Sequence, residues 1–434
     1  MRIAYIGAGA AGMYCGSCIH DNTLAAALMA QGHQVTLIPT YTPIRTDEEG
    51  VGIDRVFYGA INVFLQQKFR LFRRTPETLD RWLDRPGLLS WVSRFAASTD
   101  ARVLGELTLS VLRGEEGRQR KELAKLIEWL QGLRPEIVQL PNAMFLGLAR
   151  ELKRRLGMPV VCGLTGEDLF LEELPEPSRA EVLAELRRRA RDADGFIATS
   201  RYYGEVMRQL LGVEGERMHV VPLGVDLDQM GSRQSRRSPD DAVVVGYLAR
   251  ICPEKGPQIL LEAFRRLVAG RRDNPEIFLE VAGYVAARHR PFLAEQQRRV
   301  AEWGLEERVK ILGEVDRRQK LDFLRRIDLL SVPTTYPDPK GLYILEALAH
   351  GVPVVQPRHG AFPELIEATG GGTLVEPGSP EALAEGLREL IDNVALRREL
   401  GSRGQKAVEE RFHHHAMAER TADVYRAVLA RPVS

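Results

Sequence analysis

The sequence predicts an α/β protein built from two doubly wound, Rossmann-like domains. Short apolar segments alternate with amphipathic helical segments through most of its 434 residues. Because that length exceeds what one ordinary hydrophobic core holds, two domains are expected. A polar stretch rich in Ser and Arg at residues 231–239 interrupts the alternation, as an interdomain linker would. We therefore expect one domain over residues 1–231 and a second over residues 232–412.

The composition excludes several function classes. Hydrophobic residues make up 44% and charged residues 27%, which is typical of a globular enzyme. The net charge of +1 gives no global field that would attract nucleic acid. No apolar run reaches the roughly 18 residues of a spanning helix, and the N-terminus lacks a signal-peptide layout. Four cysteines indicate a reducing compartment rather than a disulfide framework, so we expect a cytoplasmic protein.

The first strand, residues 2–6, leads into a Gly-rich segment, G-A-G-A-A-G at residues 7–12. A G-x-G-x-x-G after a strand can mark a dinucleotide site, so an NAD- or FAD-dependent oxidoreductase is one hypothesis. Against it, the second strand (residues 34–38) is followed by no acid for a ribose hydroxyl, and the next helix is expected only from about Asp21. The alternative is a long loop that lines a cleft and approaches a ligand closely.

That loop carries a C-x-x-C pair, Cys15 and Cys18. No second cysteine pair or nearby histidine cluster completes a zinc set, and a redox motif lacks its surrounding pattern. We interpret the pair as reduced thiols beside the cleft. His20, Asp21 and Asn22 follow, and they could either line the cleft or cap a helix over residues 23–31.

The alternation stops between about residues 55 and 130, where aromatic and arginine residues interleave. We expect a helical insertion here, interpreted as a subdomain with a solvated basic face. A cover over the acceptor side or a surface that contacts a membrane peripherally are the alternatives. Strands are then expected at residues 136–140, 159–163, 195–199 and 218–222. Thr165, Glu167 and Asp168 follow the second of these, at the strand end where α/β sheets keep their ligands.

The C-terminal half begins again with a strand at residues 242–247, and Arg250 and Lys255 follow it before a helix that opens at Pro257. Two cations at a strand-to-helix junction suit a diphosphate. The later segment at residues 331–360 reads as strand, Pro-rich loop, helix and strand, with Asp338 in the loop and Glu346 inside the helix. A loop that feeds a helix N-terminus suits a phosphate, so the segment predicts a nucleotide-sugar site.

These residues together resemble the retaining glycosyltransferases of family 4, which have the GT-B architecture. The acid–seven residues–Glu motif of that family is similar to Asp338 to Glu346, and its basic pair is similar to Arg250 and Lys255. V-P-L-G-V-D at residues 221–226, G-V-P-V-V at 351–355 and G-T-L-V-E-P-G at 372–378 complete the likeness. The resemblance implies two Rossmann-like domains facing across a cleft, acceptor-side first and donor-side second. Residues 413–434 are expected to form a closing helix (over residues 416–429) that crosses back to the first domain.

The resemblance also implies roles for individual residues. Arg250 and Lys255 would neutralise a leaving diphosphate, so no divalent metal and no cofactor is expected. Asp338 would contact the donor sugar and Glu346 the ribose. Backbone at Gly341 and Leu342, with Gly12 and Gly16 of the first loop, would complete the donor contacts. The acceptor is open: a small molecule, a lipid-linked molecule or a glycan.

The sequence departs from the family pattern in two places. The first acid of the motif is commonly Glu and is Asp338 here, which leaves the sugar open. The family often has His at Thr165 and around Gln139 to Pro141, so the acceptor-side candidates are instead His20, Asp21, Thr165 and the set Asn142, Glu167 and Asp168. A non-catalytic protein that binds nucleotide sugars is therefore a further hypothesis, with the oxidoreductase less favoured.

Overall fold

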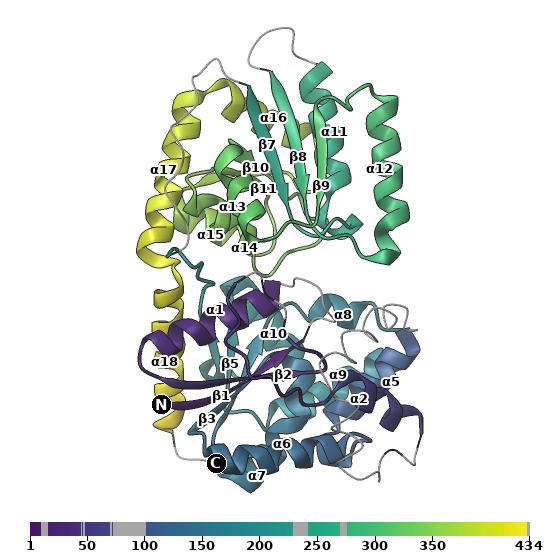
Figure 1. The fold of residues 1–434 in the computed structure, drawn as a ribbon, viewed down its shortest axis with the longest axis vertical. Helices are drawn as coiled ribbons and strands as arrows, with labels where there is room; N and C mark the ends of the chain where they lie inside the picture. Colours follow the sequence, from purple (N-terminus) through teal and green to yellow (C-terminus); the bar gives the residue numbers. More distant parts are fainter. Residues whose placement is uncertain are drawn as a thin grey trace. The chain divides into compact units, whose positions relative to one another are not determined.

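The computed structural model describes residues 1–9, 16–44, 46, 48–69, 72, 101–228, 242–269 and 276–431. The chain divides into two compact units: Met1–Pro222 together with His415–Ser434, and Leu223–His414. Figure 1 shows both units and labels most of their helices and strands. The sequence placed these divisions at residues 231 and 412, and the candidate linker at 231–239 lies outside the described residues.

A six-stranded parallel sheet forms the centre of the first unit, in the order β2-β1-β3-β4-β5-β6. Its strands are β1 (Arg2–Ala8), β2 (Gln34–Thr40), β3 (Ile137–Leu140), β4 (Val160–Leu164), β5 (Gly195–Ala198) and β6 (Met218–Val220). The helices are α1 (Gly16–Ala30), α2 (Ala60–Lys68), α5 (Ala101–Leu112), α6 (Arg120–Leu133), α7 (Ala149–Leu156), α8 (Asp168–Glu172), α9 (Ser178–Ala190), α10 (Arg201–Leu211) and α18 (His414–Leu429). Short 3-10 turns are η3 (Gly114–Glu116), η4 (Ala143–Leu148) and η5 (Gly215–Arg217).

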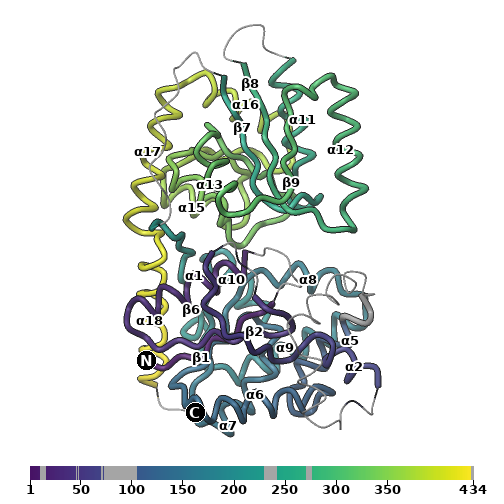
Figure 2. Tube along the Cα trace, in the orientation of Figure 1, coloured from purple at the N-terminus to yellow at the C-terminus, as the bar shows by residue number. Residues whose placement is uncertain are grey.

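The two faces of this sheet carry separate hydrophobic clusters, because side chains alternate along each strand. Ile3 and Tyr5 of β1 pack with α1 and α18, whereas Ala4 and Ile6 pack with helices of the other face. Figure 2 shows the N-terminal α1 and the C-terminal α18 lying side by side in the first unit. The last helix thus supplies part of the core that the first strand and helix begin.

The second unit is also built on a parallel six-stranded sheet, in the order β12-β11-β10-β7-β8-β9. Its strands are β7 (Val243–Leu248), β8 (Ile277–Ala282), β9 (Val309–Gly313), β10 (Leu329–Leu330), β11 (Val354–Pro357) and β12 (Gly372–Val375). The helices are α11 (Pro257–Ala269), α12 (Arg290–Glu302), α13 (Arg317–Arg326), α14 (Leu342–Ala349), α15 (Phe362–Thr369), α16 (Pro380–Asp392) and α17 (Val394–Arg411), with 3-10 turns η6 (Pro253–Lys255) and η7 (Ala287–His289). This is the Rossmann strand order, and it confirms the predicted fold class.

Local signals in the sequence account for many element ends. Ser200 caps α10 by accepting from the Tyr203 amide at 3.1 Å. Asp316 and Gln319 form a reciprocal capping box at the start of α13. Strands β3, β4, β7, β10 and β11 are buried along their whole length, as parallel strands covered on both faces require, whereas the edge strands β6, β9 and β12 are mostly half-buried.

Two predicted helices were wrong in their extent. Helix α1 begins at Gly16, five residues before the predicted start, so Cys18 lies in a helix and not in a loop. Its Sγ donates to the Ala8 carbonyl at 3.2 Å; Gly12 and Cys15 lie outside the described residues. The closing helix begins at His414, two residues early.

The predicted insertion at residues 55–130 contains the helices α2, α5 and part of α6. Phe57 is buried and its ring lies 5.2 Å from that of Trp129, whereas Phe64 and Phe69 are exposed. Residues 70, 71 and 73–100, which hold most of the aromatic and arginine residues that suggested a membrane-contacting surface, lie outside the described residues. Within the described ranges, no helix combines the length and apolarity needed to cross a bilayer.

Candidate functional site

The two chemistry-bearing segments of the second unit meet where its strand order reverses. β7 and β10 are neighbours in the sheet, with Leu329 opposite Val245, and the strands added after each run outward in opposite directions. Arg250 and Lys255 follow the carboxyl end of β7, and Asp338 follows that of β10. Open α/β sheets bind their ligands in the crevice at such a switch point. The fold therefore brings the predicted basic pair and the first acid to one edge.

Lys255 and Asp338 form a buried ion pair at this edge. The Lys255 Nζ lies 2.5 Å from Asp338 Oδ2, and the two side chains are 11% and 4% exposed. Lys255 ends the turn η6, and Asp338 lies in the Pro-rich loop before α14. The residues are 83 positions apart in the chain, so only the fold explains their contact.

Two tyrosines complete the surroundings of this pair. The Lys255 Nζ donates to the Tyr336 hydroxyl at 2.7 Å, and the Tyr343 hydroxyl donates to Asp338 Oδ2 at 3.2 Å. The Lys255 ammonium also lies 4.9 Å from the centre of the Tyr336 ring, within cation–π range. Backbone amides of Lys340 and Gly341 approach Asp338 Oδ1 at 3.0 and 3.4 Å. Sequence reasoning missed both tyrosines, although their spacing from Asp338 could have suggested them.

The electrostatics of the pair follow from these contacts. Burial by itself would raise the pKa of Asp338, but the Lys255 ammonium and the Lys340 amide outweigh it and lower the pKa to about 2. Burial likewise opposes charge on Lys255, yet Asp338 and Tyr336 raise its pKa above the ordinary value. The pKa of Tyr336 rises to about 12 because the ring is buried and lies beside Asp338. Lys255 and Asp338 are therefore both ionised at neutral pH.

Close backbone packing fixes the geometry of this cluster. A Cβ on Gly256 would lie 1.7 Å from the Pro333 carbonyl oxygen, so only glycine lets the Lys255 turn approach the loop after β10. Gly360 similarly has φ 59° and leaves no room for a Cβ beside the Asp338 backbone, 2.5 Å from its oxygen. These two glycines position Lys255 and Asp338 relative to each other.

The other predicted donor-side residues have different surroundings. Arg250 is exposed, and its backbone carbonyl accepts from the Tyr247 hydroxyl at 2.8 Å. Gly341 has φ 67° and precedes Leu342, the first residue of α14. Gly16 is the exposed first residue of α1 in the other unit.

Glu346 lies inside α14 and forms a second buried ion pair. Its Oε1 lies 2.8 Å from the Nζ of Lys320 on α13, and each side chain is 11% exposed. The sequence pointed to Glu346 but gave no sign of Lys320, which lies 26 residues away.

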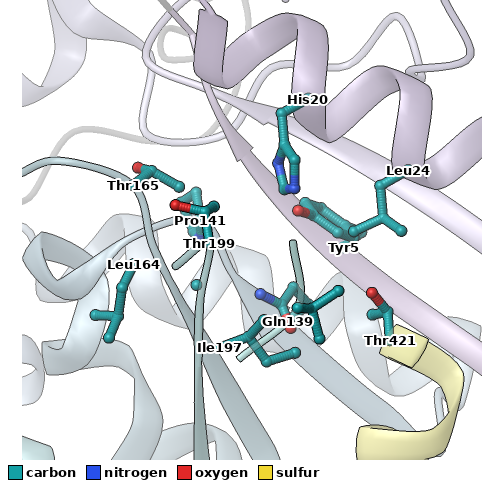
Figure 3. A pocket seen from close by; sticks show the side chains of 12 residues that line it. Tyr5, His20, Leu24, Gln139, Pro141, Leu164, Thr165, Ile197, Thr199 and Thr421 are labelled. Atoms are coloured by element: carbon teal, nitrogen blue, oxygen red, sulfur yellow. The ribbon is translucent and has the colours of Figure 1, made fainter. Parts of the chain in front are cut away.

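The first unit holds a small pocket on the sheet face that α1 and α18 cover. It is lined by Tyr5, His20, Leu24, Gln139, Pro141, Gly163, Leu164, Thr165, Ile197, Thr199, Val221 and Thr421. Figure 3 shows His20 approaching Tyr5 from α1, and Thr421 reaching the pocket from α18. Two predicted acceptor-side residues, His20 and Thr165, are therefore brought together.

Asp21 does not line this pocket itself, but it contacts two residues that do, Tyr5 and His20. Its Oδ1 accepts from the Tyr5 hydroxyl at 2.9 Å and lies 3.1 Å from the Nδ1 of His20. Asp21 is only 3% exposed, so its carboxylate positions His20 instead of facing solvent. Burial, followed by the Asp21 charge, raises the pKa of Tyr5 far above its usual range.

Two of the three other acceptor-side candidates, Glu167 and Asn142, form hydrogen bonds within the fold. Glu167 is buried and accepts from the Ala143 and Thr165 amides at 2.8 and 2.7 Å and from the Tyr203 hydroxyl. Burial raises the pKa of Glu167 despite these donors. Asn142 caps η4 by accepting from the Met144 amide. Asp168 begins α8, and its buried Oδ1 has no hydrogen-bond partner among the described residues.

Comparison with solved structures identifies the fold. Sucrose-phosphate synthase from Thermosynechococcus elongatus superposes with a TM-score of 0.70 at 18% identity, covering 99% of both chains. Anabaena HepE in complex with UDP gives a TM-score of 0.68 at 19% identity, covering 98% of this chain and 100% of HepE. The strand orders and these similarities define the class: this is a glycosyltransferase fold of the GT-B type.

Sequence families identify the group more closely. Residues 228–407 match the family described as glycosyl transferases group 1, and residues 103–229 match glycosyltransferase family 4. The chain belongs to glycosyltransferase family 4. Among curated relatives, D-inositol 3-phosphate glycosyltransferase 2 of Catenulispora acidiphila is 30% identical over 288 residues, 63% of this chain. The corresponding protein of Xylanimonas cellulosilytica is 30% identical over 274 residues, 60% of this chain. These matches span 66% and 63% of the relatives' own lengths, just under two thirds.

Proposed function

We propose that this protein is a retaining glycosyltransferase that moves a sugar from a nucleoside-diphosphate sugar to a hydroxylated acceptor. The observation that carries the proposal is the buried Lys255–Asp338 pair at the switch point of the second sheet. One structural neighbour with the same fold supports a nucleotide-sugar donor, since HepE was solved with UDP and with UDP-glucose.

Lys255 is suited to a diphosphate because its ammonium has three donors. Among the described residues, Asp338 and Tyr336 accept two of them, which leaves one for a phosphate oxygen. Arg250 adds an exposed cation that follows the same strand. Two cations at this edge would stabilise the charge that develops on the leaving diphosphate, so the proposed reaction needs no divalent metal.

The acids complete the proposed donor site. Asp338 accepts from Lys255 and Tyr343 through one oxygen, and its carboxylate would also accept from hydroxyls of the donor sugar. Glu346 would accept from the ribose. As the sugar gains oxocarbenium character, the departing phosphate would take the acceptor's proton on the same face. That same-face route retains the anomeric configuration.

The acceptor is proposed from the first unit and from the relatives. Several curated relatives act, by name, on D-inositol 3-phosphate. The pocket of the first unit offers an imidazole at His20 and hydroxyls at Thr165 and Thr199, groups that bind a polyol. We therefore propose a hydroxylated small molecule as acceptor, with an inositol phosphate as the first compound to test, and a cytoplasmic location.

A donor panel tests the proposal. The full chain is incubated with UDP-, GDP- and ADP-sugars, with and without inositol phosphates, and nucleotide release and product anomer are measured. The proposal predicts release with at least one donor and an α-linked product from an α-donor. Donor binding without release under any acceptor would favour a non-catalytic binding protein. Tight binding of NAD or FAD with no binding of any sugar nucleotide would favour the oxidoreductase hypothesis.

A further inference from the structure

A buried lysine of the second unit lies on a helix face that otherwise packs into the core. Lys320 is on α13, and Phe323 and Leu324, three and four positions further, are fully buried. Residues at this spacing share one face of a helix. Lys320 itself is 9% exposed, so a cation occupies a place where an apolar side chain would pack. Burying an ammonium is costly unless a specific partner compensates it.

Three other cations of α13 pair with acids other than Glu346. Arg325 pairs with Asp322 on its own helix, Arg326 pairs with Glu280 of β8, and Arg317 pairs with Asp226. Lys320 instead reaches the carboxylate of Glu346 at 2.8 Å. The capping box of Asp316 and Gln319 fixes the start of α13 and hence the register that places Lys320 there.

The contact between Lys320 and Glu346 involves only one oxygen of the Glu346 carboxylate. Lys320 donates to Oε1, and no described residue donates to Oε2. Glu346 is the one acid on α14, whose other residues from Tyr343 to Ala349 are buried and uncharged. A carboxylate held through one oxygen presents its other oxygen in a fixed direction. A site that accepts hydrogen bonds from the two hydroxyls of a neutral diol requires such a fixed acceptor.

We propose that Lys320 is a positioning residue that orients the Glu346 carboxylate toward the ribose 2′- and 3′-hydroxyls of the nucleotide. The inference rests on the proposed function, because it assumes that Glu346 receives a ribose. Lys320 makes no contact with the nucleotide in this arrangement. Its effect on binding passes through Glu346, and it disappears when the ribose hydroxyls are absent.

The dependence of this effect on the ribose hydroxyls can be tested on the full chain. The affinities of wild type and Lys320→Met are measured calorimetrically for UDP and for 2′,3′-dideoxy-UDP, with GDP and ADP and their dideoxy analogues run in parallel. We expect Lys320→Met to weaken the preferred ribonucleotide about 10-fold but its dideoxy analogue less than about 2-fold. In turnover assays the donor KM should rise by about the same factor, with kcat nearly unchanged.

Controls separate positioning from general damage. Lys320→Arg keeps a donor and should recover most of the affinity. Lys125→Met removes a matched lysine in the first unit, 2.9 Å from Glu122 and 10% exposed, and should leave nucleotide affinity unchanged. Should Lys320→Met not fold, Lys320→Gln carries the same comparison.

Equal weakening of the ribo- and dideoxynucleotide, or no weakening of either, would overturn the inference while leaving the proposed function intact. A wild-type protein that binds no nucleoside diphosphate would overturn the proposed function, and the inference with it. The two failures are therefore distinguished by the wild-type titration alone.

Discussion

The Nζ of Lys255 and the Oδ2 of Asp338 lie 2.5 Å apart, and both side chains are buried. The Lys255 ammonium and the Asp338 carboxylate therefore lie together at the point where the strand order of the second sheet reverses. A buried pair costs desolvation energy that hydrogen bonds must offset, and here Tyr336, Tyr343 and the Lys340 amide supply them. An arrangement this costly is better explained by ligand binding than by stability.

The pair should show strong energetic coupling. Lys255→Met leaves the Asp338 carboxylate buried without its cation and should destabilise the second unit by about 3–5 kcal/mol. The double variant Lys255→Met with Asp338→Asn should be less destabilised than the single one, because the stranded charge is gone. Hydrogen exchange of β7 and β10 amides in the full chain measures this. Additive effects of the two changes would contradict the buried ion pair.

The stability that Asp338 provides should depend on pH in a defined direction. Its pKa is lowered in the folded chain from 3.8 to about 2, so the folded state holds the ionised form more strongly than the unfolded state. The contribution is complete above about pH 5 and is lost as the pH falls through the folded pKa. The shift corresponds to about 2 kcal/mol. Unfolding of wild type and Asp338→Asn compared at pH 7, 5, 3 and 2 should show a difference that shrinks by about that amount only below pH 4.

Removing the Tyr343 hydroxyl should affect transfer more than stability. Tyr343→Phe deletes a 3.2 Å donor to Asp338 while the Lys255 contact remains, so unfolding should change by about 1 kcal/mol. With Asp338 held by one donor fewer, kcat/KM for the donor should fall about 10-fold. Tyr425→Phe is the matched control, because its buried hydroxyl also donates over 3.2 Å, to Gln139. Equal losses of kcat/KM in both variants would argue against a specific role for Tyr343.

Variants of Asn142 can distinguish a structural role of this residue from a role in binding the acceptor. Its side chain accepts from the Met144 amide at 3.1 Å and caps η4. Asn142→Ala should cost about 1 kcal/mol, whereas Asn142→Asp keeps the cap and should unfold like wild type. If Asn142 only caps the turn, Asn142→Asp also keeps the acceptor KM. A raised acceptor KM at wild-type stability would instead return Asn142 to the acceptor site.

Much of the fold could be predicted from the sequence, because parallel strands covered on both faces are continuous apolar runs. The start of α1 was not, since Gly16 and Ser17 disfavour a first helical turn. In the structure Leu24, Ala25 and Leu28 of that helix pack into the core beside β1, and this packing overrides local propensity.

The site was predictable only in part, for a physical reason. Arg250, Lys255 and Asp338 follow strand ends, and Glu346 lies in the helix after Asp338. Such positions are visible in a sequence. The contact of Lys320 with Glu346 depends on how α13 packs against α14, which no local pattern encodes. Glu167 was also suggested by its place after a strand end, and the structure adds that its carboxylate accepts from the Ala143 and Thr165 amides.

Nucleotide binding by charge variants tests the central claim most directly. UDP, GDP and ADP are titrated calorimetrically into wild type, Arg250→Ala and Lys255→Ala, with Arg265→Ala as a control for loss of an arginine paired with Glu262 on α11. If Arg250 and Lys255 bind the diphosphate, each of their variants should lose at least about 10-fold in affinity for the preferred nucleotide, and Arg265→Ala should lose none. Unchanged affinity in both Arg250→Ala and Lys255→Ala would contradict a diphosphate site at this edge of the sheet.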